Sequence, residues 1–226
     1  MEKIKPRIPE GGAIEDSSEM TMEQYSEIMK KLLGKEYKRF AANVTNKIKP
    51  LQNSLTLEIG PGPGWAGINL LKQRNDLMLE GLEASSDMVR VATENAAKEG
   101  LAEKVTYKTG MGESMKSIPD QHYDLVISRD SLHHWKNPKK VFLEIRRVLK
   151  PDGKIYIHDH RRDLNFFGRS IVAVFSRLIA GDMGKYWRSS IAASYTKEEI
   201  EKILKKIDCS DWQVNTELMD LTIQKI

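Results

Sequence analysis

The sequence predicts an α/β protein: a seven-stranded, mostly parallel sheet with helices on both faces. Short apolar stretches with strand character alternate with longer stretches of helical periodicity, which is the pattern of such a sheet. A glycine-rich loop joins the first predicted strand to the helix that follows it. The 226 residues suffice for one well-buried domain but not for two ordinary ones.

The first strand, loop and helix span residues 55–71. Apolar residues alternate from Leu55 to Ile59, four glycines follow between positions 60 and 67, and a helical pattern begins at Ile68. Glycine lacks a Cβ, and a helix N-terminus presents N–H donors and a partial positive charge. A ligand can therefore lie directly against this backbone.

The loop also satisfies the pattern G-x-G-x-x-G, so a dinucleotide site, and with it an NAD(P)-dependent oxidoreductase, is one interpretation. Two features disfavour a diphosphate. Pro61 and Pro63 have no N–H to donate, and Glu58 places a carboxylate beside the loop. A nucleoside with a cationic end suits the loop better, and S-adenosylmethionine has an ammonium group, a sulfonium and no phosphate.

Several segments, in the expected order, resemble class I S-adenosylmethionine-dependent methyltransferases. They cover roughly residues 50 to 160, and they are E-I-G-P-G-P-G at 58–64, G-L-E at 81–83, Y-D-L-V-I-S at 123–128, L-H-H-W at 132–135 and R-V-L-K-P-D-G at 147–153. The resemblance implies a Rossmann-like fold, S-adenosyl-L-methionine as the cofactor and methyl transfer to a small-molecule acceptor.

Composition narrows the classes of partner. Lysine and arginine number 36 against 32 aspartates and glutamates, a net charge of +4 that is spread along the chain, so a nucleic-acid partner is not expected. No apolar run reaches the ~20 residues of a membrane span and no signal-peptide core is seen, so we expect no membrane partner and a cytoplasmic protein. Cys209 is the single cysteine, which excludes an internal disulfide. The oligomeric state stays open.

The expected domain organisation has two parts. Residues 1–50 form an N-terminal tail and a helical cover, and residues 51–226 form the S-adenosylmethionine-binding domain, with an insertion at about 161–195 after the fifth strand. The N-terminal helices cover the cofactor or acceptor, or else simply pack on the sheet.

Within the first part, residues 1–20 are rich in proline, glycine and charge and predict a mobile tail. A capping box at Thr21 begins a helix that Gly34 ends, and a second helix stops at Pro50.

Periodicity and capping signals place the other elements. Further strands are expected at 77–82, 105–109, 124–128, 154–159, 212–217 and 219–226. Further helices are expected from Ser85 to Gly100, after Asn137, over 164–178 and after Thr196, with a loop around 181–188.

The resemblance also implies a set of cofactor contacts. Glu83, about 20 residues beyond the glycine loop, can accept hydrogen bonds from both ribose hydroxyls. Met111 stands where the family commonly has the aspartate that binds the adenine amino group, so Glu113, a backbone carbonyl or apolar contact must replace it. Met88 packs on the adenine or is an ordinary core residue. The full set is Glu58, Gly60, Pro61, Gly62, Glu83, Ala84, Met88, Gly110, Met111, Gly112, Glu113, Ser128 and Arg129.

Methyl transfer requires an acceptor lone pair held opposite the sulfur, and a neutral acceptor must also lose a proton. Asp130, His133 and His160 are the candidate bases, with Asp130 first, although a thiolate or carboxylate acceptor needs none. His134 occupies the family's L-x-H position and is interpreted as a packing residue. His158 and His160 face the same way on a strand, but no third ligand can be assigned, so no metal is expected.

Arg161, Tyr186, Trp187 and Arg188 indicate an acceptor with a flat or apolar part and an anionic group. The alternative for this set is a capped loop with surface arginines. The function predicted is an S-adenosylmethionine-dependent methyltransferase acting on a small molecule. The alternatives are an NAD(P)-dependent oxidoreductase, a methyltransferase acting on RNA or protein, and a module that binds the nucleoside without transferring methyl groups.

Overall fold

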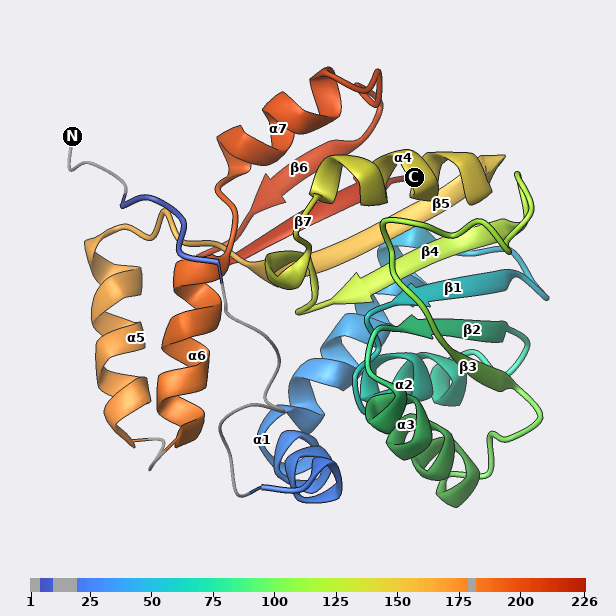
Figure 1. Ribbon diagram of the computed structural model, residues 1–226, viewed down its shortest axis with the longest axis horizontal. Coiled ribbons are helices and arrows are strands. Elements are labelled where there is room, and N and C mark those ends of the chain that lie inside the picture. Colours follow the sequence, from blue (N-terminus) through green and yellow to red (C-terminus); the bar gives the residue numbers. More distant parts are fainter. Residues whose placement is uncertain (1–4, 10–19, 179–181) are drawn as a thin grey trace.

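The computed structural model describes residues 5–9, 20–178 and 182–226. Its centre is a sheet with helices on both faces (Figure 1). Most of the predicted tail, residues 1–4 and 10–19, lies outside the described residues.

The sheet has seven strands in the order β3-β2-β1-β4-β5-β7-β6. The first five pair in parallel, and β7 runs antiparallel to both β5 and β6. This confirms the predicted class. The strands are β1 (Leu55–Ile59), β2 (Met78–Glu83), β3 (Val105–Thr109), β4 (Tyr123–Arg129), β5 (Leu149–His160), β6 (Gln213–Thr216) and β7 (Asp220–Lys225).

Side chains alternate between the two faces of the sheet and build a core on each. Leu57, Val126 and Ile157 pack in the core that α4 and α7 cover. Leu125 and Tyr156, one position away on their strands, pack in the core formed with α1, α2 and α3. The covering helices are α1 (Met22–Asn43), α2 (Trp65–Gln73), α3 (Ser86–Lys98), α4 (Pro138–Val148) and α7 (Lys197–Lys205).

The N-terminal helix is longer than predicted. The capping box at Thr21 is present, but α1 continues through Gly34 to Asn43 and then into a π-helical turn, Val44–Ile48. The prediction that Gly34 ends the helix is wrong. A glycine inside a helix costs only about 1 kcal/mol, and the burial of Tyr37 and Phe40 beyond it outweighs that cost.

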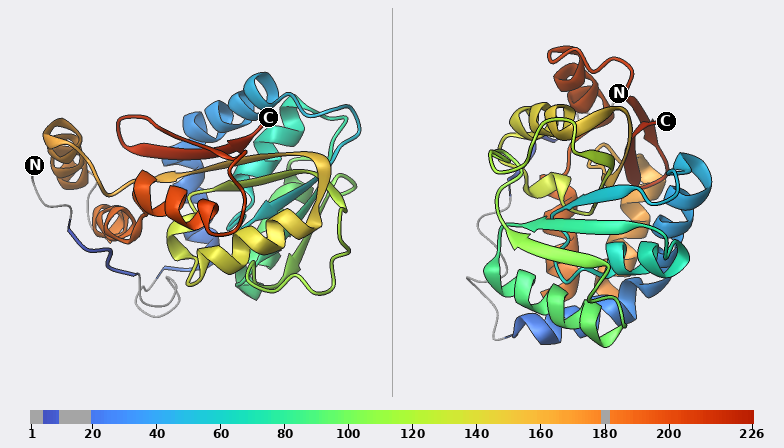
Figure 2. Two further views of the ribbon diagram at one scale, coloured as in Figure 1. Left: turned by 90° about the horizontal axis from the view of Figure 1, so that it is seen from above. Right: turned by 90° about the vertical axis from the view of Figure 1, so that its right-hand side faces the viewer.

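The segment after β5 forms two helices, α5 (Phe166–Leu178) and α6 (Asp182–Ala193), where a loop was expected around 181–188. Gly181 lies outside the described residues. The loop prediction is wrong because Trp187 and Ile191 recur at helical spacing and pack with Val172 of α5 in a small separate core. Figures 1 and 2 show α5 and α6 side by side beyond the carboxyl end of β5, with α5 the farther of the two from the sheet.

Candidate active site

The glycine loop between β1 and α2 is held closely on two sides and is open on a third. Gly60, Gly62 and Gly64 have positive φ angles of 63°, 51° and 82°. A Cβ on Gly60 would lie 2.0 Å from the Ser131 hydroxyl oxygen, and one on Gly64 would lie 2.6 Å from that of Tyr107. Apart from its chain neighbours, no described residue has an atom within 4 Å of the corresponding point on Gly62, so a ligand can approach the backbone there.

The amide N–H groups of the glycine loop are hydrogen-bonded within the protein. The Gly60 N–H donates to the Leu82 carbonyl at 2.9 Å, and the Gly64 N–H donates to the Pro61 carbonyl at 2.9 Å. The Gly62 N–H donates to the Glu83 carboxylate at 2.9 Å. Because the two intervening prolines carry no N–H, this stretch offers little to a diphosphate. The geometry therefore agrees with the argument against a dinucleotide.

Glu83 stands at the end of β2 over this loop. Its two carboxylate oxygens accept hydrogen bonds from the N–H groups of Gly62, at 2.9 Å, and Ser85, at 3.1 Å. A carboxylate has about four acceptor positions, so capacity remains for hydroxyl groups of a ligand. The residues of the loop thus fit a nucleoside whose sugar meets Glu83.

Glu58 is buried beneath the loop and is 1% exposed. Its Oε1 accepts a hydrogen bond from the Gly67 N–H at 3.1 Å, and its Oε2 has no hydrogen-bond partner among the described residues. Burial raises the pKa of the Glu58 carboxyl to about 8, so in the protein alone it is mostly protonated at neutral pH. The full negative charge expected beside the loop is therefore absent, although a cation bound nearby would restore it.

Two residues that the sequence analysis missed hold the loop from outside. The Asn95 side-chain amide of α3 donates to the Pro63 carbonyl and to the Ser26 hydroxyl, both at 2.9 Å. The Trp65 indole N–H donates to the Ser26 carbonyl at 3.1 Å. Asn95 lies among buried alanines on its helix, and a polar residue on an apolar helical face was the available signal.

The other predicted cofactor residues differ in what their side chains do. The buried Ser128 hydroxyl donates to the Ile59 carbonyl at 2.8 Å and so joins β4 to β1. Met88 is buried in α3, whereas Met111 is 49% exposed. Glu113 accepts a hydrogen bond from the Asn137 N–H at 3.5 Å. Their contacts to a cofactor stay predictions.

A cavity of about 1040 Å³ opens beside the end of β4, between α1 and the α5–α6 pair. Its walls are largely apolar and include Tyr25, Met29, Ile171, Phe175, Tyr186 and Trp187. Of the residues predicted to bind the acceptor, Tyr186 and Trp187 line this cavity, and Arg161 and Arg188 do not. Arg161 instead pairs with Asp163 at 2.8 Å, and Arg188 donates to the Ser176 carbonyl at 3.5 Å.

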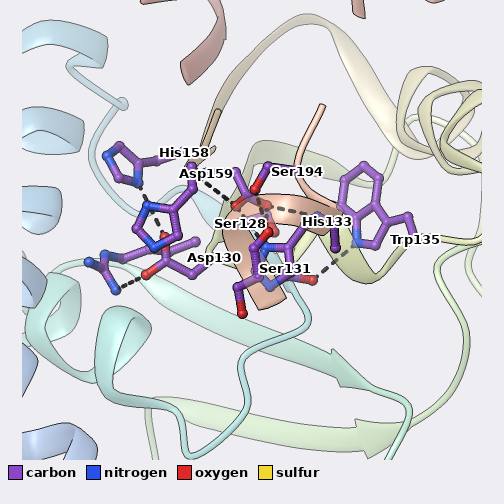
Figure 3. Close-up of polar contacts among 12 residues, drawn as sticks. Ser128, Asp130, Ser131, His133, Trp135, His158, Asp159 and Ser194 are labelled. Atoms are coloured by element: carbon purple, nitrogen blue, oxygen red, sulfur yellow. Dashed lines mark hydrogen bonds and ion pairs between the residues drawn. The ribbon is translucent and has the colours of Figure 1, made fainter. Parts of the chain in front are cut away.

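Charged and titratable residues also line the cavity, and Figure 3 shows the contacts of two of them, Asp130 and His158. Asp130 pairs with Arg129 at 2.5 Å and lies 3.5 Å from Nδ1 of His158. Asp220 lies 3.6 Å from Nε2 of His158 and 3.2 Å from Nδ1 of His160. Two carboxylates, two histidines and an arginine thus form one connected network.

The network fixes the charge of its members. Burial alone would lower the pKa of His158, but the nearby carboxylates of Asp130 and Asp220 outweigh burial and raise the pKa to about 9. Burial would raise the pKa of the Asp130 carboxyl. The charge of Arg129 and the contact with His158 outweigh burial and hold this pKa well below its usual range. The pKa of His160 is raised as well, because its contact with Asp220 outweighs burial. At neutral pH His158 is therefore protonated and ion-paired with Asp130 and Asp220, and a carboxylate held in this way is a weak base.

His133 occupies a different environment, on the other face of the sheet edge. Its Nδ1 lies 2.7 Å from Oδ1 of Asp159, and its backbone N–H donates to Oδ2 at 2.8 Å. The ring is 3% exposed and belongs to the cavity lining. Asp159 therefore fixes the orientation of the imidazole and assigns the proton of a neutral ring to Nδ1.

His134, interpreted as a packing residue, packs its ring on that of His133, with the ring centroids 4.1 Å apart. Residues Leu132–His134 form a 3₁₀ turn in which His133 is buried and His134 is exposed. Successive residues of such a turn point in directions about 120° apart, so only one of the two imidazoles can meet Asp159.

The described residues contain neither a cluster of metal ligands nor a helix that could span a membrane. No three of the described histidines, cysteines, aspartates and glutamates are grouped so that they could hold a metal ion. No helix among residues 5–9, 20–178 and 182–226 combines the length and apolar character that crossing a bilayer requires.

Known proteins are similar to this chain in sequence and in fold. A family model described as a methyltransferase domain matches residues 57–157. YcgJ of Bacillus subtilis, described as an uncharacterized methyltransferase, is 33% identical over 104 residues, which are 46% of this chain but only 40% of YcgJ. YdaC of the same organism, described in the same way, is 30% identical over 137 residues, which are 58% of this chain and 73% of YdaC. The chain belongs to the S-adenosylmethionine-dependent methyltransferase family.

One solved structure has a similar fold over nearly the whole length of this chain. The crystal structure of a protein from Methanococcus maripaludis, assigned as an S-adenosyl-L-methionine-dependent methyltransferase, aligns with a TM-score of 0.74 and 27% sequence identity. The alignment covers 95% of this chain and 96% of that one. The similarity therefore includes the helices that surround the cavity as well as the sheet.

The buried Glu58 makes the stability of the methyltransferase depend on pH. A carboxyl whose pKa is higher in the folded state stabilises the fold below its unfolded pKa of about 4.5, and this contribution is lost as pH rises toward about 8. Urea denaturation of the protein and of Glu58→Gln should give similar unfolding free energies at pH 5. At pH 8.5 the variant should be more stable by roughly 2 to 4 kcal/mol.

His158 titrates in the same window but is present in both proteins, so its effect cancels in the difference. A difference between the two proteins that stays constant from pH 5 to 8.5 would show that Glu58 does not titrate as described.

Proposed function

We propose that this methyltransferase transfers a methyl group from S-adenosylmethionine to a small-molecule acceptor bound in the cavity between α1, α5 and α6. The observation that carries the proposal is the position of this cavity. It begins at Arg129 and Asp130, where β4 ends beside the glycine loop, and its volume of about 1040 Å³ is at the upper end of the range for small-molecule sites, ~300 to 1000 Å³.

S-adenosylmethionine supplies a methyl group on a positively charged sulfur. In the proposal, Glu83 binds the ribose hydroxyls and the open backbone at Gly62 lies against the nucleoside. Glu58, with its unpartnered oxygen, stabilises the cationic end of the cofactor from beneath the loop. Met88 and Met111 supply apolar contact for the adenine.

For an acceptor that must lose a proton, we assign the base to His133. Its ring is oriented by Asp159, in the way that a carboxylate orients a catalytic imidazole. Of the other candidates, Asp130 is ion-paired with Arg129 and His160 lies 3.2 Å from Asp220, which suits them to orient a polar group of the acceptor. An acceptor that is already a thiolate or carboxylate needs no base.

One relative supports a small molecule over RNA or protein. A demethylmenaquinone methyltransferase of Bacteroides fragilis is 24% identical over 207 residues, which are 88% of this chain and 83% of that protein. Its name specifies a small-molecule acceptor. The apolar walls of the cavity here are consistent with an acceptor that is partly apolar as well.

Glu83→Ala should weaken binding of S-adenosylmethionine, measured by titration calorimetry, by roughly 1 to 3 kcal/mol, because charge-assisted hydrogen bonds to the ribose are lost. Glu80→Ala is the matched control, since Glu80 lies on the same strand but pairs with Lys108 at 2.9 Å. Equal affinity in the Glu83 variant and the unaltered protein would remove Glu83 from the site.

The acceptor class is tested with S-adenosylmethionine labelled in the methyl group and a cell extract divided into small-molecule and macromolecular fractions. We expect label in the small-molecule fraction. Trp187→Ala, which removes part of a cavity wall, should lower transfer about tenfold or more while cofactor affinity is kept. Phe166→Ala is the control, because Phe166 is 84% exposed and does not line the cavity. Label in RNA or protein alone would contradict the proposal.

A further inference from the structure

The N-terminal segment 5–9 lies against the end of α6, far along the chain from its own position in the sequence (Figure 1). The Ile8 N–H donates to the Ala192 carbonyl at 3.0 Å and fixes the segment there. Of the five residues, four are exposed and only Arg7 is half-buried. The side chain of Arg7 therefore points into the protein while its neighbours face solvent.

The guanidinium of Arg7 joins α6 to the turn that carries His133. Its Nη2 donates to the His133 carbonyl at 2.6 Å, and its Nε donates to the Ala193 carbonyl at 2.5 Å. Its Cζ lies 4.3 Å from the centre of the Tyr195 ring, which is a cation–π contact. The Tyr195 hydroxyl in turn donates to the Trp135 carbonyl at 3.1 Å. One side chain thus holds two separate segments together.

The turn depends on contacts from outside because Leu132–His134 is only a single turn of 3₁₀ helix. So short a helix leaves carbonyl groups at its end without partners of its own. Asp159 fixes the ring and the backbone N–H of His133, and Arg7 supplies the donor for its carbonyl. A charged donor forms the stronger kind of hydrogen bond. His133 is therefore held by two charged residues, one at each side of its backbone.

The same segment forms part of the cavity wall. Ile8 and Pro9 line the cavity together with His133, whereas Arg7 does not line it. Arg7 therefore acts on the imidazole through the His133 backbone and not through contact with an acceptor.

We propose that Arg7 is a positioning residue, which keeps the His133 imidazole directed into the acceptor cavity. A lysine cannot fully replace it, because an ammonium lacks the planar fork that meets two carbonyls and a ring at once. That this orientation serves methyl transfer rests on the proposed function, whereas the hold of Arg7 on His133 does not.

The test is the rate at which the His133 Nδ1–H exchanges with water, measured by NMR on protein with isotopically labelled histidine. The resonance is identified by its absence from His133→Asn. In Arg7→Ala the exchange should be about tenfold faster or more, as expected when a hydrogen bond from a charged group is lost. Arg7→Lys should lie between this variant and the unaltered protein. Unchanged amide resonances of β1, β2 and β3 serve as the check of folding.

The matched control is Lys5→Ala, which removes the same charge from the same segment. Lys5 is exposed, and its backbone carbonyl accepts a hydrogen bond from Arg162 at 3.2 Å. Its variant should exchange like the unaltered protein. Unchanged exchange in Arg7→Ala would overturn the proposal, as would equal acceleration in Lys5→Ala.

The consequence for methyl transfer is measured with the small-molecule fraction of a cell extract and labelled S-adenosylmethionine. The rate of transfer by Arg7→Ala at saturating cofactor should be about tenfold lower, with the KM for S-adenosylmethionine unchanged. An unchanged rate would contradict the positioning role. Absence of transfer by the unaltered protein would instead contradict the proposed function, and the exchange measurement would still test the hold of Arg7 on His133.

Discussion

The hydrogen bond from the Gly62 N–H to the Glu83 carboxylate is the contact on which the site depends. It joins the loop after β1 to the end of β2. It also holds the Glu83 carboxylate beside the Gly62 backbone, which no side chain covers and which a ligand can therefore approach. With the neighbouring amides bonded inside the protein and two prolines in the loop, the site suits a neutral sugar and a cationic end better than a diphosphate. The fold places this contact where β1 pairs with β2 on one side and β4 on the other, which is the position of the ligand crevice in open α/β sheets.

The second half of the site comes from segments far apart in the sequence. β4 and β5 deliver Asp130 and His158, β7 delivers Asp220, and α1, α5 and α6 provide apolar walls. Because successive side chains of a strand point to opposite faces, the ion-paired histidine and the carboxylate that orients His133 lie on different faces of the sheet. His158 faces the α1 side and is held in ion pairs, whereas Asp159, its neighbour, faces the other side and orients His133. One short strand end thus supplies both a charged floor and an oriented imidazole.

The parts predicted from the sequence are those that local rules determine. Glycines and alternating apolar residues located the loop and strands, and capping boxes located the starts at Thr21 and Thr196. The role of Asp220 could not be predicted, because it depends on the antiparallel register that sets Asp220 opposite His160. The pairing of His133 with Asp159 likewise depends on how a three-residue turn meets a strand end. The helix α6 could not be predicted, because Gly184 in its first turn favours a loop and only the packing of Trp187 and Ile191 against Val172 outweighs this.

The most direct test of this account is a crystal structure with S-adenosylhomocysteine. The account predicts the ribose hydroxyls within hydrogen-bonding distance of Glu83, about 2.6 to 3.2 Å, and the sulfur directed toward Arg129 and Asp130 at the start of the cavity. A nucleoside bound away from the glycine loop, or a sulfur directed away from the cavity, would contradict it.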